Sequence, residues 1–331
     1  MAQIKSKISS VGHYVPDHVL TNHDLEQMVE TNDEWIRTRT GISERRILKD
    51  PGKATAFMST EAGKEALELA GLDPAELDAI IVATVTPDYM FPATSCLVQN
   101  RLGARNAFAF DLSAACSGFI YALSTGSMMI ESGRYKKVLV IGSDTMSSII
   151  DYTDRTTCII FGDGAGAVLL ETSDDETGII DFVNHTEGDE ECLLYQPAGG
   201  SLHPATEDTV KAKQHVIMQD GRAVFKRATE GMADVSVEIM ERNNLKADDV
   251  AWLVPHQANK RIIDAIARRM ELPEEKVMSN IHKFGNTTAA TIPLCLYDWK
   301  DQLAHGDNII LSAFGGGFTW GSVYLKWSIK S

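Results

Sequence analysis

The stretch AFAFDLSAACSGFIYAL (107–123) changes its hydrophobic period part-way along, and this change predicts the local fold. Its first six residues, 107–112, form an apolar run typical of a strand that is buried on both faces. From Phe119 to Ile130, apolar and small residues recur at helical spacing. The stretch therefore predicts a buried strand that turns sharply into a buried helix, with Cys116 at the junction.

Cys116 is a candidate nucleophile because of this position. The unpaired N–H groups and the macrodipole of a helix N-terminus favour a negative charge such as a thiolate. We therefore expect its pKa to lie below the ordinary value of about 8.5. The small residues of 113–118 would let a substrate come close. A free cysteine is also among the most frequently buried residue types, so this window alone leaves a nucleophile and a core residue equally open.

Length and charge restrict the class of protein. The chain has 331 residues, of which 44% are hydrophobic, enough for a large core or for two domains of about 150 residues each. Its net charge of −15 argues against a general nucleic-acid-binding protein, although it allows a local basic patch. The composition is that of a globular protein of enzyme size.

The spacing of the cysteines and the length of the apolar runs indicate in which cellular compartment the protein works. No C-x-x-C pair and no histidine cluster at metal-ligand spacing occurs, so we expect neither a zinc site nor a disulfide framework. We also expect no signal peptide and no membrane span, since no apolar run approaches about 20 residues. Reduced thiols in the cytoplasm fit best. The five cysteines are Cys96, Cys116, Cys158, Cys192 and Cys295.

The segment DEWIRTRTGI (33–42) places one aromatic and two basic side chains close together, in a loop or short helix. Trp35, Arg37 and Arg39 could stack on a flat ring and pair with a phosphate. The alternative is a surface tryptophan beside solvated arginines. Taken alone, the segment favours that alternative.

The second half of the chain repeats the order of the first. The segment VAWLVPHQAN (250–259) corresponds to LDAIIVATVTPD (77–88), and KVMSNIHKFGNTTAATIPLCL (276–296) corresponds to the opening stretch. The segment NIILSAFGGGFTWGSVYLKW (308–327) corresponds to the two strands predicted after that stretch. Self-similarity at about half the chain length predicts two packed copies of one α/β unit.

Three candidate residues lie at related corners of the two copies: Cys116 in the first, and His256 and Asn286 in the second. A pseudo-twofold arrangement would bring these corners together. Singly, each has an ordinary interpretation, since most histidines are surface or core residues and a Gly-Asn dipeptide is common in turns. Three matching positions favour one shared site.

Seven motifs carry a resemblance to a known family. They are DEWIRTRTGI, AACSGF, TDRTT, FGDGAGA, PHQANKRII, GNTTAAT and AFGGGFTWG, and they run in order along almost the whole chain. The chain thereby resembles the thiolase superfamily and, within it, the β-ketoacyl-[acyl-carrier-protein] synthase III family, which initiates type II fatty acid synthesis. The resemblance implies a five-layered αβαβα fold of two duplicated halves. Residues 1–175 would carry the nucleophilic cysteine, and residues 176–331 the histidine and asparagine.

The resemblance also implies a reaction, the decarboxylative Claisen condensation of an acyltransferase. Cys116 would take the acyl group of acyl-CoA as a thioester. His256 and Asn286 would then donate hydrogen bonds to the enolate that malonyl-acyl carrier protein forms on losing CO₂. The N–H groups of Cys116 and Gly316 would form a second oxyanion hole, because the glycine run leaves room for substrate. No metal and no cofactor is implied, since acyl-CoA and malonyl-acyl carrier protein are substrates.

The same matching to the family implies binding residues. At Trp35 it favours a ligand contact over the surface tryptophan that the segment alone indicated. Phe91 would reach across a homodimer to close the acyl pocket. A basic helix in an acidic protein would suit electrostatic docking of an acidic carrier protein, although a solvated helix face is its alternative. The CoA path would include Trp35, Arg39, Arg155, Gly221, Phe225, Ala228 and Asn259. The carrier-protein patch would include Lys260, Arg261, Arg268 and Arg269.

Other interpretations stay open. A related acyltransferase or condensing enzyme of secondary metabolism would share these motifs. A catalytically idle subunit would not need the three candidate residues, and a cysteine hydrolase would use asparagine to orient histidine rather than to face substrate. Thr156, where the family commonly has glycine, and the long segment 189–215 leave the preferred primer undetermined.

Overall fold

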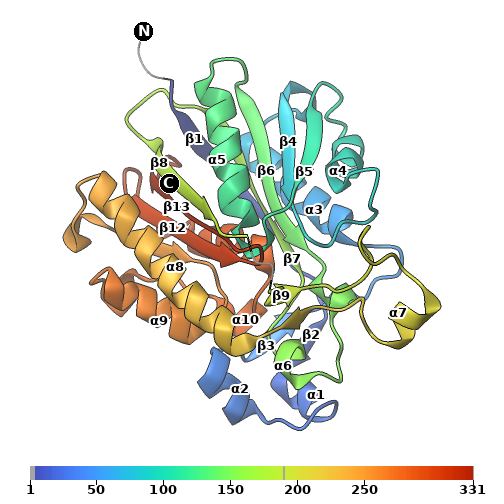
Figure 1. Cartoon of the computed structure of the whole chain (residues 1–331). Helices are drawn as coiled ribbons and strands as arrows, with labels where there is room; N and C mark the ends of the chain where they lie inside the picture. Colours follow the sequence, from blue (N-terminus) through green and yellow to red (C-terminus); the bar gives the residue numbers. More distant parts are fainter. Residues whose placement is uncertain (1–3, 189–190, 331) are drawn as a thin grey trace.

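Two stacked sheets alternate with three layers of helices in the computed structural model, which describes residues 4–188 and 191–330 (Figure 1). Strands in the first sheet run in the order β1 (Ser6–Tyr14), β7 (Gly164–Thr172), β6 (Lys137–Asp144), β4 (Ala79–Ala83) and β5 (Phe108–Leu112). Strands in the second run in the order β11 (Trp252–Pro255), β12 (Asn308–Gly315), β13 (Thr319–Lys326) and β8 (Gly178–Thr186).

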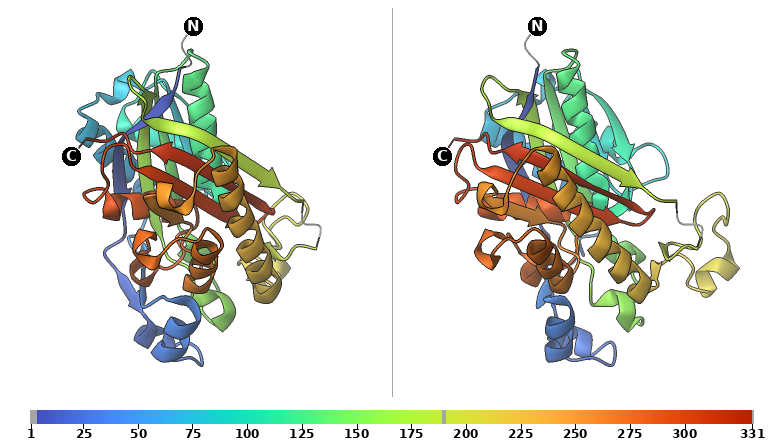
Figure 2. Two further views of the ribbon diagram at one scale, coloured as in Figure 1. Left: turned by 90° about the vertical axis from the view of Figure 1, so that its left-hand side faces the viewer. Right: turned by 60° about the vertical axis from the view of Figure 1, so that its left-hand side comes forward.

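The helices cover both sheets on both faces. One pair packs on the outer face of the first sheet, a second pair lies between the sheets, and a third covers the second sheet, where Figure 2 shows α8 crossing its strands. The predicted five-layered αβαβα fold is therefore confirmed. In this order the pairs are α3 (Thr55–Ala70) with α4 (Thr94–Leu102), α5 (Gly118–Glu131) with α11 (Thr291–Trp299), and α8 (Gly221–Arg242) with α9 (Lys260–Arg269).

The two sheets repeat one pattern of pairing. In the first, β6 runs parallel to β4 and antiparallel to β7; in the second, β12 runs parallel to β11 and antiparallel to β13. A parallel bridge between Leu253 and Val277 stands where β4 pairs with β5. A short 3₁₀ turn precedes each central helix, η2 (Ala115–Ser117) before α5 and η6 (Thr288–Ala290) before α11. The predicted duplication is thus seen strand by strand.

The opening stretch folds partly as predicted. Helix α5 begins at Gly118, directly after the turn that holds Cys116. The prediction that residues 107–112 are buried on both faces is wrong, because β5 pairs only with β4 and Phe108 is 45% exposed. An apolar run does not distinguish a central strand from an edge strand, which has unpaired backbone N–H and C=O groups along one side.

Short elements gather at one end of the strands (Figure 1). There α2 (Asp33–Thr40) carries the DEWIRTRT sequence as a helix. No helix among residues 4–188 and 191–330 is long and apolar enough to cross a membrane. The remaining short elements are α1 (Asn22–Glu26), β2 (Val19–Thr21), β3 (Glu44–Arg46), α6 (Arg155–Cys158), β9 (Leu194–Tyr195), α7 (Glu207–Lys211), β10 (Met218–Gln219) and α10 (Ile281–Phe284).

Candidate active site

A cavity of about 580 Å³ lies where the two halves meet, and Cys116, His256 and Asn286 all line it. Cys116 comes from the turn before α5, His256 from the end of β11, and Asn286 from the turn after α10. All three side chains are largely buried, with exposed fractions of 8%, 1% and 6%. Residues predicted from separate halves of the chain therefore share one site.

Cys116 is held as a neutral thiol. Burial, followed by the nearby carboxylate of Asp144, raises the pKa of Cys116 to about 12, while a hydrogen bond from Asn286 acts in the opposite direction. The expectation of a pKa below the ordinary value is therefore wrong for the ligand-free chain. Loss of hydration and a like charge outweigh the favourable field of the helix end.

His256 is anchored through its Nδ1 atom, which lies 2.7 Å from Thr291 Oγ1. That hydroxyl has one hydrogen and lies 3.0 Å from the Thr288 carbonyl, which can only accept. Because the Thr291 hydroxyl donates its hydrogen to that carbonyl, it can only accept from Nδ1. We therefore assign the ring proton to Nδ1, and Nε2 faces the cavity as an acceptor. Burial lowers the pKa of His256 to about 3, so the ring is neutral. For Nε2 to act as a donor, the Thr291 hydroxyl must turn toward Nδ1.

Asn286 is fixed by its backbone and by its side chain. Its N–H donates to Ile160 O at 2.9 Å, and its carbonyl accepts from Gly162 N at 3.0 Å. Its Oδ1 accepts from the N–H of Thr288 at 2.8 Å. This last bond identifies the oxygen of the carboxamide and leaves the NH₂ group for the thiol and the cavity.

The glycine run of the last two strands closes tightly on the cysteine turn. A Cβ atom on Gly315 would lie 2.6 Å from Cys116 N and 3.0 Å from Ala114 O. Gly316 lines the cavity beside Leu194. The predicted reason for these glycines was access for substrate; at Gly315 the chain's own turn already requires the absence of a side chain.

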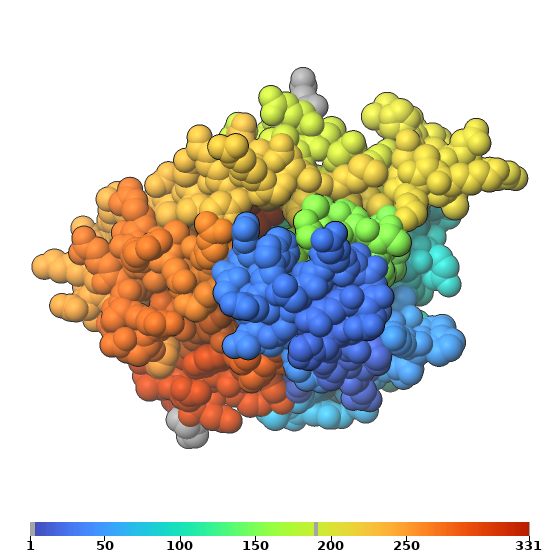
Figure 3. All heavy atoms as spheres, turned by 90° about the horizontal axis from the view of Figure 1, so that it is seen from below, coloured from blue at the N-terminus to red at the C-terminus, as the bar shows by residue number. Residues whose placement is uncertain are grey.

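Four of the seven predicted CoA contacts line the cavity, and the other three lie on α2 and α6. Figure 3 shows this face, where α2, α6 and α8 surround a small hollow. Asn259 Nδ2 donates to Arg39 O at 3.0 Å and so ties the cavity lining to α2. Gly221, Phe225, Ala228 and Asn259 line the cavity, whereas Trp35, Arg39 and Arg155 do not.

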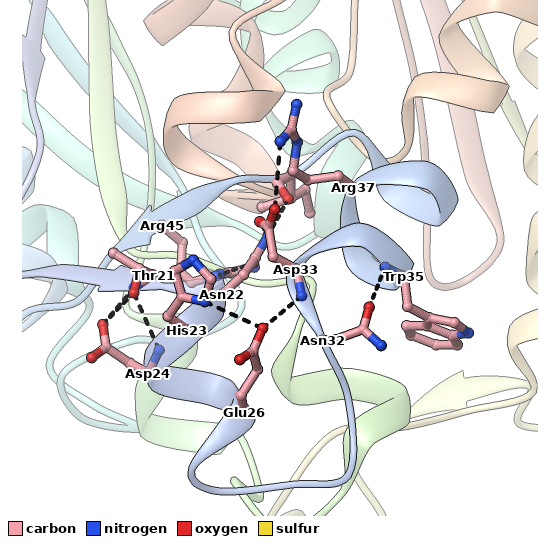
Figure 4. Close-up of polar contacts among 11 residues, drawn as sticks. Thr21, Asn22, His23, Asp24, Glu26, Asn32, Asp33, Trp35, Arg37 and Arg45 are labelled. Atoms are coloured by element: carbon pink, nitrogen blue, oxygen red, sulfur yellow. Dashed lines mark hydrogen bonds and ion pairs between the residues drawn. The ribbon is translucent and has the colours of Figure 1, made fainter.

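Trp35 lies close to two guanidinium groups. The Cζ atoms of Arg39 and Arg155 are 5.3 and 5.1 Å from its ring centroid. Asn32 caps α2 by accepting a hydrogen bond from Trp35 N at 2.8 Å, and the ring points away from the polar cluster around Asp33 (Figure 4). The cap fixes the first turn of the helix and thereby the place of the tryptophan.

The predicted carrier-protein patch lies on α9, but part of its charge is paired. Lys260 forms ion pairs with Asp264 and Glu274, and Arg269 lies 3.6 Å from Asp234. Arg261 stacks over the Phe225 ring at 5.1 Å, which joins this helix to the cavity wall. Arg261, Arg268 and Arg269 are exposed and Lys260 is half-buried.

Phe91 does not line the cavity of the single chain. Its side chain is 86% exposed, and its neighbours Tyr89 and Met90 are 60% and 81% exposed. Three consecutive large apolar side chains on the surface indicate a contact with another molecule.

Several residues of the site were not predicted. Asp144 lies outside the seven motifs, and only its place as a charged residue at the end of a buried strand could have pointed to it. Thr291 is the last residue of the GNTTAAT motif, but the sequence did not predict that it orients His256. Thr156 lines the cavity, and its carbonyl accepts at 3.0 Å from Nε2 of Gln219, which lies in β10, just after the long segment 189–215. Residues 189 and 190 of that segment lie outside the described residues. Other lining residues are Val85, Met146, Ile149, Leu194, Tyr195 and Ile217.

Comparisons with known proteins match almost the whole chain. The family model for 3-Oxoacyl-[acyl-carrier-protein (ACP)] synthase III matches residues 110–188, and the model for its C-terminal part matches residues 240–327. A β-ketoacyl-[acyl-carrier-protein] synthase III of Chlorobium chlorochromatii is 58% identical over 330 residues, covering 98% of this chain and 100% of its own. The chain belongs to the β-ketoacyl-[acyl-carrier-protein] synthase III family. It is thus of the acyltransferase class.

Solved structures of the synthase III family have the same fold. The 3-oxoacyl-[acyl-carrier-protein] synthase III of Aquifex aeolicus superposes with a TM-score of 0.89 at 47% identity, over 97% of this chain and 100% of its own. The priming β-ketosynthase of the R1128 polyketide pathway reaches 0.89 at 34% identity, over 98% and 96%. Within the described residues, His, Cys, Asp and Glu side chains form no group of three or more that could hold a metal ion.

Proposed function

We propose that this chain condenses a primer acyl-CoA with malonyl-acyl carrier protein to give β-ketoacyl-acyl carrier protein, CoA and CO₂. The observation that carries the proposal is the meeting of Cys116, His256 and Asn286 in one buried cavity. A nucleophile for the acyl group and polar groups for an enolate are the two requirements of this reaction. Neither acyl transfer nor decarboxylation by this route needs a cofactor.

In the first step, Cys116 Sγ attacks the thioester carbon of acyl-CoA. The thiol proton leaves the sulfur, the new S–C bond forms, and CoA departs with a proton as its thiol. Because the resting cysteine is a thiol, the proton needs an acceptor, and Nε2 of neutral His256 offers a lone pair in the same cavity. The N–H groups of Cys116 and Gly316 would hold the oxyanion of the tetrahedral adduct.

In the second step, malonyl-acyl carrier protein loses CO₂ and its thioester becomes an enolate. The NH₂ group of Asn286 and a protonated Nε2 of His256 would donate to the enolate oxygen. The enolate carbon then attacks the acyl carbon on Cys116, the C–S bond breaks, and the sulfur leaves as a thiolate that takes up one proton from solvent to become the resting thiol again. Between the two steps the neutral ring would lose its Nδ1 proton to water and take up one proton from water at Nε2, and turning of the Thr291 hydroxyl toward Nδ1 would stabilise this second tautomer.

The entrance supports CoA and an acidic carrier protein as the partners. Trp35 with Arg39 and Arg155 offers an aromatic face and positive charge at the mouth, which suit an adenine ring and phosphates. Arg261 and Arg268 remain exposed on α9 for the carrier protein. Both patches lie on an otherwise acidic chain.

We also propose a homodimer formed through the open edge of the first sheet. Phe108 on β5 is partly exposed, and Tyr89, Met90 and Phe91 are mostly exposed on the preceding loop. Pairing of two β5 strands would satisfy the unpaired edge and cover this surface. Phe91 would then reach the partner's acyl pocket.

We further propose that the halves divide near residue 175, between β7 and β8. The cytoplasm is the proposed location, because all five cysteines are free thiols, which is typical of a reducing compartment.

Incubation with a panel of acyl-CoAs, followed by intact mass measurement, tests the proposal. We expect an acyl adduct that is absent in Cys116→Ala, and release of CO₂ and ketoacyl product when malonyl-acyl carrier protein is added. An adduct without condensation would instead favour a related acyltransferase of secondary metabolism, and no adduct with any acyl-CoA would contradict the enzymatic proposal.

A further inference from the structure

The duplication gives two equivalent turns, Ala115–Ser117 and Thr288–Ala290, and each of them contacts the end of a strand from the other half. Cys116 in the first turn corresponds to Ala289 in the second, since each is the middle residue of the 3₁₀ turn before a central helix. The residues before them, Ala115 and Thr288, both have a left-handed backbone, with φ of 47° and 50°. The two turns therefore share one backbone geometry as well as one position.

The strand ends that meet these turns differ in their side chains. Gly315 ends β12 and lies against Cys116 N, where it adds no side chain. Asp144 ends β6 at the corresponding position and sends its carboxylate to the other turn. Asp144 and Gly315 are each the eighth and last residue of an eight-residue strand, and each pairs with the first residue of the next antiparallel strand.

Asp144 accepts hydrogen bonds from both halves of the chain. On one side, Oδ2 accepts from Thr288 Oγ1 and from Ala289 N, the latter at 3.4 Å. On the other side, Oδ1 accepts four bonds between 2.8 and 3.1 Å from the loop after β4. Six donors on two oxygens suit a carboxylate, which only accepts. The four donors to Oδ1 are Thr84 Oγ1, Val85 N, Thr86 N and Thr86 Oγ1.

The side chain is 0% exposed, and burial raises the pKa of its carboxyl group while these hydrogen bonds lower it. A buried carboxylate is costly unless its partners are well placed, so it enforces the arrangement of the groups that surround it. Thr288 is one of those groups, and its N–H is the donor that fixes Asn286 Oδ1.

We propose that Asp144 is a positioning residue for the condensation step. The Asp144 carboxylate lies at the turn Thr288–Ala290, in the position that corresponds to the proposed position of the thioester oxyanion at the Cys116 turn. Through Thr288, it keeps the NH₂ group of Asn286 turned to the cavity. The inference rests on the proposed function, in which Asn286 acts only after Cys116 has been acylated. It assigns a role to the turn Thr288–Ala290, which binds the Asp144 carboxylate of the same chain where the equivalent Cys116 turn would bind the substrate oxyanion.

Asp144→Asn is the first variant, because the carboxamide has the shape of the carboxylate. Four donors surround Oδ1, so the amide NH₂ would face Thr288 and Ala289 and meet the Ala289 N–H donor. Loosening of the turn should misplace Asn286, and a misplacement of about 1 Å costs roughly 100-fold in rate. We expect condensation with malonyl-acyl carrier protein to fall about 30- to 100-fold. Acylation of Cys116 should not slow, because loss of the Asp144 charge lowers the pKa of the thiol.

Thr288→Val provides a second variant, since valine keeps the shape of the side chain and removes only the donor to Asp144. Thr288→Ser keeps the hydroxyl and is the matched control. We expect the valine variant to lose condensation selectively and the serine variant to retain it within about threefold. Thermal unfolding of each variant reports on the fold, so this pair remains informative if Asp144→Asn is unstable.

A double-mutant cycle with Asn286→Ala tests the route. If Asp144 acts through Asn286, the double variant should condense no more slowly than Asn286→Ala alone. Equal slowing of acylation and condensation, condensation within threefold of wild type in Asp144→Asn, or additive losses in the cycle would each overturn the proposal. Failure of the proposed function looks different, because wild type itself would then not condense.

Discussion

Gly315→Ala is the substitution whose effect can be worked out most directly from the structure. The added Cβ would lie 2.6 Å from Cys116 N, 2.9 Å from Ser117 N and 3.0 Å from Ala114 O. All three atoms belong to the backbone of the cysteine turn, so no side chain can rotate away. The turn or the strand end must move by about 0.8 Å to reach ordinary van der Waals contact.

That movement acts on the proposed oxyanion hole. The N–H of Cys116 would no longer point to the position of the tetrahedral oxyanion, and the methyl group would lie beside it. Loss of one such donor costs about 2.7–4 kcal/mol, which corresponds to a rate loss of about 10²–10³-fold. We therefore expect acylation by acyl-CoA to slow by that factor, with condensation limited by the same step.

Single-turnover acylation followed by intact mass is the assay. Gly200→Ala is the matched control, because a Cβ at Gly200 meets nothing within 4 Å. Thermal unfolding establishes that each variant is folded. A folded Gly315→Ala variant that acylates within about fivefold of wild type would show that the N–H of Cys116 does not bind the oxyanion.

Four further results are expected. Burial lowers the pKa of His256 to about 3, whereas an unfolded histidine titrates near about 6.5, so the stability from this group is present above pH 6.5 and lost as the pH falls. Denaturant titrations from pH 6.5 to 5 should show that His256→Gln removes a slope that rises from about 0.7 kcal/mol per pH unit at pH 6.5 toward about 1.4 at pH 5; equal slopes would refute this. Alkylation of Cys116, followed by peptide mass, should still accelerate above pH 9, since its pKa is raised to about 12, and a plateau near pH 8 would contradict it. Arg155→Ala should raise KM for acyl-CoA about fivefold through the lost contact at Trp35 but leave KM for an acyl-pantetheine unchanged; equal effects on both would refute an adenine contact. Phe91→Asp should yield monomers in sedimentation velocity, and an intact dimer would place the interface elsewhere.

The sequence predicted those features that depend on local period and on repetition. The change of period at Cys116 indicated the strand, the turn and α5, and the repeat predicted that His256 and Asn286 would approach the same place. Both predictions rest on backbone periodicity, which neighbouring residues determine.

Features that depend on contacts between residues far apart in the sequence could not be predicted in this way. The thiol pKa is raised by burial and by Asp144, which arrives from another strand, and the His256 ring is oriented by a hydroxyl 35 residues further along the chain. The bond from Thr288 to Asp144 spans 144 residues. Exposure of β5 depends on which strand ends the sheet, and the apolar run of that strand contains no such information.

The close fit between Gly315 and the cysteine turn also has a consequence for synthesis of the chain. The strands of the first sheet and Cys116 leave the ribosome before β11, and Gly315 follows only after most of the second sheet has been made. A nascent or prematurely released fragment would therefore hold the cysteine without the glycine backbone, the histidine or the asparagine. Such a fragment would lack the proposed oxyanion hole, so the proposed acylation of Cys116 depends on residues from both halves of the chain.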